Sequence, residues 1–195
     1  MVGATRRLIA CWLAALALPV AAEDFTTRGT CRDGLPQGVY ELRGENGRLR
    51  VLGAYNQGRR TGSFLFWTST GVRIAHLPYS EGALNGTVSL WYADSNGAEP
   101  RRKLEAAYVA NRREGETRSW HGNGKLRARY IYRAGELRSA EAWDDDGRKL
   151  PPGDARDLAA RDLAADNDFF NSLDRIVRAH PPDCQGPQAP LQRAA

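Results

Sequence analysis

The chain has 195 residues, of which 42% are hydrophobic and 26% are charged, and its mean hydropathy is -0.56. This composition fits one globular domain or a short repeat array, and it excludes a membrane-spanning bundle and a disordered chain. A formal net charge of +5 is too small to imply a nucleic-acid partner, and twenty glycines indicate many tight turns.

Residues 1–22 have the pattern of a secretory signal peptide. Arg6 and Arg7 precede an apolar run at 8–20, and small residues end the segment at Ala22. The run is too short for a membrane-spanning helix, although an N-terminal anchor left uncleaved is the alternative. We therefore expect cleavage after Ala22 and a periplasmic or secreted mature protein.

Cleavage would leave two cysteines, Cys31 and Cys184, near opposite ends of the mature chain. Exported proteins fold in an oxidising compartment, where paired thiols persist as disulfides. We expect these two residues to form a disulfide, with two free buried thiols as the alternative. Three scattered histidines and two cysteines lack metal-ligand spacing, so no metal site is expected.

After an N-terminal segment at 23–37, residues 38–150 repeat a short motif. A tyrosine recurs at intervals of about 24 to 29 residues, and a glycine follows seven residues after each of the first three. A tryptophan also occurs once per unit. The recurring residues are Tyr55, Tyr79, Tyr108 and Tyr132, then Gly62, Gly86 and Gly115, and finally Trp67, Trp91, Trp120 and Trp143.

Each unit reads as two strands joined by turns. The Asn-Gly pairs at 46–47, 96–97 and 123–124 are typical of two-residue type I′ hairpin turns. Apolar residues alternate with polar ones, which predicts one buried and one wet face. The wet face is expected to carry Arg50, His76, Lys103, Glu105, Arg127 and Arg129. The fold class is therefore mainly β: a single elongated, twisted antiparallel meander of repeated hairpins.

The repeat resembles the MORN-variant repeat of bacterial proteins often labelled antitoxin-like. The best-matching unit runs from Trp120 to Leu126 and continues to Tyr132 and Gly135, and the resemblance covers about 35–150. It implies a non-catalytic β-repeat scaffold. For eukaryotic relatives it implies contacts with protein or lipid, and the antitoxin label implies binding of a toxin.

Residues 151–195 read as a helical cap and tail. The expected helix runs from Asp154, as its N-cap, to about Ala179, and a run at 166–168 either interrupts it or caps a second helix. An apolar stripe comprises Phe169, Leu173, Ile176 and Val177. We expect this helix, or helix pair, to pack over the last hairpins and close the open end of the sheet.

No catalytic constellation or cofactor motif is found, so an enzyme, such as a wall hydrolase, is disfavoured. The acidic run at 144–146 lacks calcium-loop spacing and is read as a solvated turn. The candidate binding face is the tryptophan row Trp67, Trp91, Trp120 and Trp143, flanked by Arg118 and Arg129, and its alternative is a purely structural ladder. We expect a monomer that binds another protein, for example a toxin or effector. An envelope-associated structural protein contacting membrane lipid or cell wall is the alternative.

Overall fold

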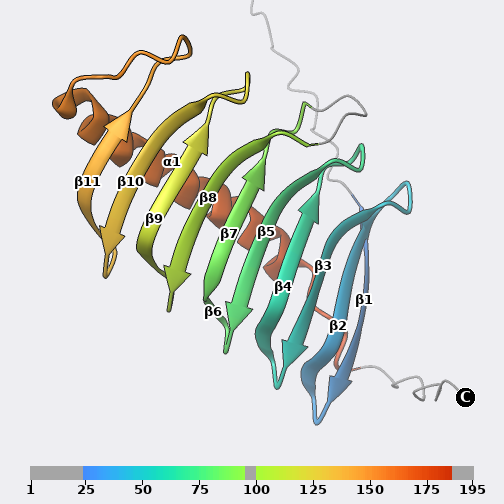
Figure 1. The fold of residues 1–195 in the computed structure, drawn as a ribbon. Helices are drawn as coiled ribbons and strands as arrows, with labels where there is room; N and C mark the ends of the chain where they lie inside the picture. Colours follow the sequence, from blue (N-terminus) through green and yellow to red (C-terminus); the bar gives the residue numbers. More distant parts are fainter. Residues whose placement is uncertain (1–23, 95–99, 186–195) are drawn as a thin grey trace, which may run out of the picture.

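The computed structural model describes residues 24–94 and 100–185, which form one open antiparallel sheet with one long helix behind it (Figure 1). The predicted signal segment, the predicted turn at 96–97 and residues 186–195 lie outside this described part. The prediction of a mainly β hairpin meander is confirmed. The elements are β1 (Phe25–Arg32), β2 (Leu35–Gly44), β3 (Leu49–Asn56), β4 (Arg59–Trp67), β5 (Arg73–Ser80), β6 (Ala83–Leu84), β7 (Gly86–Trp91), β8 (Arg102–Val109), β9 (Arg112–Trp120), β10 (Leu126–Arg133), β11 (Glu136–Ala142) and α1 (Pro152–Ala179).

Neighbouring strands in the sheet are neighbours in the chain. The order is β1-β2-β3-β4-β5-β7-β8-β9-β10-β11, and the two-residue β6 pairs with β5. The segment 23–37, which the sequence placed outside the repeats, contributes β1 and the start of β2. It therefore adds one more hairpin to the same sheet.

The hairpins alternate between two kinds of turn. Five two-residue turns at one end of the strands have positive φ at both central residues, at 33–34, 57–58, 81–82, 110–111 and 134–135. At the other end, Gly47 and Gly124 each donate an N–H to the carbonyl three residues earlier, and Asn46 and Asn123 lack positive φ. The type I′ prediction for these Asn-Gly pairs is therefore wrong. Each asparagine instead accepts the backbone N–H two residues later, at 3.0 Å.

The repeat tyrosines occupy equivalent places in the strand register. Each is paired with a positive-φ glycine of the preceding strand, where a residue with a side chain would be strained. The pairs are Gly38 with Tyr55, Gly62 with Tyr79, Gly86 with Tyr108, and Gly115 with Tyr132.

A β-bulge follows each long turn and changes which side chains face the helix. The register skips Arg50, Ile74, Lys103 and Arg127, each of which is an extra residue in its strand. Arg127 consequently forms an ion pair with Asp162 of α1, and Arg50 lies over the ring of Phe25, which packs against the core. Lys103, at the same bulge position, lines a cavity with residues of α1. The prediction that strict alternation places Arg50, Lys103 and Arg127 on the wet face is therefore wrong.

One helix, not a pair, covers the sheet. It begins at Pro152, two residues before the predicted N-cap. The run at 166–168 lies inside it without a break, because the Asp166 carboxylate binds Arg113 on β9 at 2.6 Å instead of capping a backbone N–H.

Helix α1 runs across the strands in the reverse of their chain order. Ala155 and Ala159 pack on Tyr130 and Tyr132 of β10, whereas Leu173 and Val177 join the larger cluster of the first strands. The sequence had suggested that the apolar stripe packs over the last hairpins. In the structure its residues Leu173 and Val177 instead cover the first strands. Small alanines allow close approach of helix and sheet at the other end.

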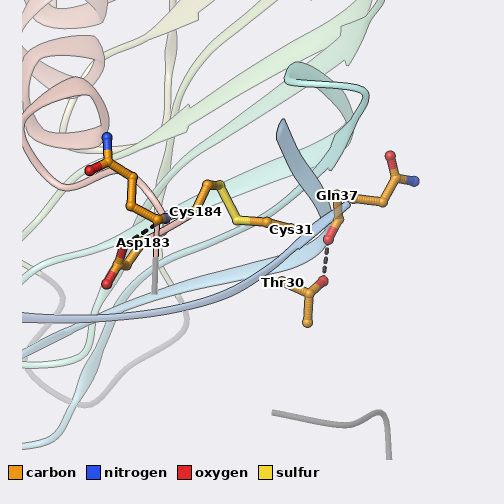
Figure 2. Close-up of a disulfide and its surroundings, with 6 residues drawn as sticks. Thr30, Cys31, Gln37, Asp183 and Cys184 are labelled. Atoms are coloured by element: carbon orange, nitrogen blue, oxygen red, sulfur yellow. Dashed lines mark hydrogen bonds between the residues drawn. A yellow bond between two sulfur atoms is a disulfide. The ribbon is translucent and has the colours of Figure 1, made fainter. Parts of the chain in front are cut away.

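A disulfide between Cys31 and Cys184 joins β1 to the segment after α1, with the two Cα atoms 5.4 Å apart (Figure 2). Nearby, the Tyr40 hydroxyl donates to the His180 carbonyl at 2.9 Å, and the Pro182 ring lies against Gly29. The two ends of the described chain are thus fastened together. This bond is compatible with a non-cytoplasmic location.

Candidate functional site

The sheet face opposite α1, here called the uncovered face, has no described element lying over it. One cross-strand row runs along it through directly paired residues. The row is uncharged in its middle and charged toward both ends. It comprises Arg28, Glu41, Leu52, Leu65, His76, Ser89, Glu105, Arg118, Arg129 and Glu141.

The four predicted tryptophans form a second row on this face, near the longer turns. Each directly follows an inward-facing residue of its strand or strand end, which places its side chain toward the uncovered face. Trp91 and Trp120 also border pockets that residues of α1 line. All four are partly buried. Their partners across the sheet are Arg73 for Trp67, Arg102 for Trp91, Leu126 for Trp120 and Lys149 for Trp143.

Cations lie over three of the rings. The Arg73 guanidinium is 4.3 Å from the Trp91 ring centre, Arg102 is 5.8 Å from Trp120, and the Lys149 ammonium is 5.9 Å from Trp143. The rings of Trp91, Trp120 and Trp143 therefore each stack with a cation of the same chain. This ladder of cations and rings favours a structural role for the ring faces and leaves other parts of the tryptophans accessible.

Sequence reasoning missed these cations, although a signal was present. A cation occurs six residues after Trp67 and Trp143, at Arg73 and Lys149, which is the distance across one long turn.

The predicted flanking arginines already have partners. Arg118 binds Glu116 at 2.6 Å, and Arg129 binds Glu141, which also accepts Lys149 at 2.5 Å. Hydrogen bonds from Lys149 and Arg129 lower the pKa of Glu141. The charged end of the uncovered face is therefore an ion-pair network with little free charge to attract an ionic ligand.

Ser63 and His76 form the one contact on the uncovered face that resembles a catalytic pair, with Oγ and Nε2 2.9 Å apart. Burial, and then the nearby Arg73, lower the pKa of His76. Among the described residues, no carboxylate orients its other ring nitrogen. Without that third group, the pair lacks the orientation that nucleophilic catalysis by serine and histidine requires.

A cavity of about 300 Å3 lies on the other side, between α1 and β8, β9 and β10. Arg127 makes two hydrogen bonds with Asp162, at 2.7 and 2.8 Å, and Tyr130 donates to the same carboxylate at 2.8 Å. Burial, and then the hydrogen bond to Asp162, raise the pKa of Tyr130 above its ordinary value. These interactions fasten α1 to the sheet.

Searches with family models and against curated proteins found no match to this chain. In 24–94 and 100–185, no three His, Cys, Asp or Glu residues gather as a metal site would require. No helix in the described part of the chain is both long and apolar enough to cross a membrane. The MORN-variant assignment stays a prediction.

Proposed function

We propose that this chain is an exported, non-enzymatic β-repeat scaffold whose uncovered face binds another protein. The observation that carries the proposal is the one-sided cover: α1 packs on one face and leaves the other, with its tryptophans, to solvent. Tryptophan and arginine are enriched among the residues that dominate binding energy at protein interfaces.

The middle of the uncovered face has suitable chemistry for a protein partner. Leu52, Leu65, His76 and Ser89 form an uncharged stretch of the cross-strand row, and Trp67 and Trp91 lie on the same strands as Leu65 and Ser89. Interface cores are depleted of charge and enriched in aromatic residues. The charged network toward β11 supplies a polar rim.

The uncovered face is also large enough. Ten strands spaced about 4.8 Å apart, with about eight residues each, span roughly 43 by 26 Å. That area, about 1,100 Å2, exceeds the roughly 800 Å2 that each partner contributes to an interface of standard size.

The repeat resemblance and the disulfide support an exported antitoxin-like or immunity-type role, in which the partner is a toxin or effector. Export is tested by the intact mass of the protein from the periplasm or medium. We expect a chain beginning at Glu23, and retention of residues 1–22 would contradict this.

The binding proposal is tested by capture from an envelope extract, identification of the partner and measurement of its affinity. Leu65→Arg and Trp91→Ala should remain folded, and Trp91→Ala should weaken binding by about 2 kcal/mol if it is a hot spot. Arg156→Ala, on the exposed side of α1, is the matched control.

If Leu65→Arg and Trp91→Ala are folded and bind as tightly as the parent, the uncovered face is not the interface. If Trp91→Ala mainly lowers the melting temperature, the ladder is structural. Sedimentation with lipid vesicles or wall fragments, without a protein partner, would favour the envelope-scaffold alternative.

A further inference from the structure

A second surface, here called the turn groove, lies between two-residue hairpin turns and the C-terminal end of α1. It has a volume of about 670 Å3, within the range of ligand-binding clefts. Tyr55, Tyr79 and Phe170 are among its aromatic walls, and Arg59 and Arg178 are exposed residues of its lining. It is on the helix side of the sheet and is separate from the uncovered face.

The turn groove repeats a structure found two units further along the sheet. In the groove, the Arg60 guanidinium lies 5.3 Å from the Tyr79 ring centre and binds Asp174 of α1 at 2.6 Å. In the later units, Arg113 lies 5.2 Å from the Tyr132 ring centre and binds Asp166 of α1.

Arg60 and Arg113 are equivalent because each lies five residues after a repeat tyrosine and is paired with it. The carbonyl of each arginine also accepts an N–H from the next two-residue turn, at 2.9 Å.

Only the later copy is filled. Tyr108 and Tyr132 are 5% and 1% exposed, and Phe170 packs edge-on against Tyr108 with ring centres 6.2 Å apart. Tyr55 and Tyr79, at the same repeat position, remain half-buried and line the open groove. In both copies α1 supplies the carboxylate, as Asp174 and as Asp166, so the open copy differs from the filled one in its missing aromatic cover.

We propose that the turn groove binds an acidic peptide segment of a partner protein that also carries an aromatic side chain. Three guanidinium groups, of Arg59, Arg60 and Arg178, line the groove with one carboxylate, Asp174, which pairs with both Arg60 and Arg178 and leaves the lining with an excess of positive charge. Arg59 reaches Glu81 outside the lining, at 3.1 Å, through an exposed ion pair that a ligand carboxylate can replace. The aromatic side chain of the ligand packs against Tyr55 and Tyr79.

The charge of the groove argues against the chain's own last residues as its occupant. Residues 186–195 contain Arg193 and no Asp or Glu, so they offer no acidic side chain to the three guanidinium groups. Acidic partner segments match the groove better.

The probe is a synthetic, fluorescently labelled peptide with the sequence of residues 165–172, which contains two aspartates and two phenylalanines. Its binding is measured by anisotropy with the full mature chain, disulfide intact. The control peptide has asparagine for both aspartates and alanine for both phenylalanines. We expect saturable binding of the first peptide, at least about tenfold tighter than any binding of the second.

Two variants locate the binding. Asn171→Trp, at an exposed residue of the groove lining, places an indole over the groove and should abolish binding. Ala164→Trp, exposed on the same helix but outside the lining, should bind like the parent. Arg59→Glu should weaken binding about tenfold by removing one cation and adding a carboxylate.

Equal binding of both peptides, or unchanged binding by Asn171→Trp, would overturn the proposal. Binding that appears only after deletion of 186–195 would show that the tail occupies the groove. A concentration-dependent dimer that Asn171→Trp abolishes would identify a second copy as the occupant. Either result would refute the proposal that an acidic partner segment occupies the groove. Neither result would bear on the proposal that the uncovered face binds a protein.

Discussion

The attachment of α1 to the sheet depends on a buried ion pair, and this predicts a large effect for one substitution. Asp166→Leu would leave the Arg113 guanidinium, whose side chain is 2% exposed, with the Tyr108 hydroxyl and the Tyr132 ring but no carboxylate partner. Removing one member of a buried pair typically costs about 3–5 kcal/mol. Because domains are stable by only about 5–15 kcal/mol, the loss should be easily measured.

The assay is urea denaturation at pH 7 with the disulfide intact, followed by circular dichroism. Glu81→Ala is the control, because its pair with Arg59 is exposed, with side chains 68% and 66% accessible. Exposed pairs contribute about 0–1 kcal/mol. The double variant Asp166→Leu with Arg113→Met should recover much of the loss, since it leaves no unpaired buried charge.

Two outcomes would refute this reasoning. The first is a cost for Asp166→Leu no larger than that of Glu81→Ala. The second is a double variant no more stable than Asp166→Leu alone, which would show that the loss comes from packing and not from the stranded charge.

Three further predictions concern the core and the crosslink. Cys31→Ser combined with Cys184→Ser should lower the free energy of unfolding by about 5 kcal/mol, because the bridge closes a loop with a sequence separation of 153; an unchanged urea midpoint would contradict this. Gly53→Ala would place a Cβ 2.5 Å from Cε1 of Phe64, so we expect a loss of about 1–3 kcal/mol, visible as a lower melting temperature. Burial holds the pKa of Tyr130 above its ordinary value, so stability should fall as pH rises through about 10, where the unfolded tyrosine ionises. Tyr130→Phe should flatten this alkaline loss in denaturation curves at pH 8 to 11, and equal slopes would argue against it.

The repeat architecture could be predicted because its causes are local. Alternating side chains, regularly spaced glycines and recurring tyrosines are all properties of short segments, and a meander needs only neighbouring segments to pair. The pairing of Gly62 with Tyr79 follows the same logic, since the repeat places one positive-φ glycine in each hairpin, opposite the tyrosine of the next strand.

The remaining features depend on contacts between distant parts of the chain. The bulge at Arg127 reverses the face expected from alternation, and Asp162, 35 residues later, supplies the partner that stabilises the new orientation. The type I′ prediction for Asn46-Gly47 failed because the turn there is longer than two residues. Such a turn needs positive φ at Gly47 alone, and a two-residue turn needs it at both positions. The turn groove could not be predicted, because it exists only where α1 stops covering equivalent tyrosines.

The direction of α1 has a consequence for the order in which the protein is completed during synthesis. The first hairpins to leave the ribosome present Tyr40, Leu42 and Phe64 on a face whose cover, Leu173 and Val177, is made last. The apolar face of the first hairpins therefore stays uncovered for longest during synthesis, and the face of each later hairpin stays uncovered for a shorter time. Nascent chains stalled before α1 should accordingly be the most prone to aggregate and the most dependent on chaperones.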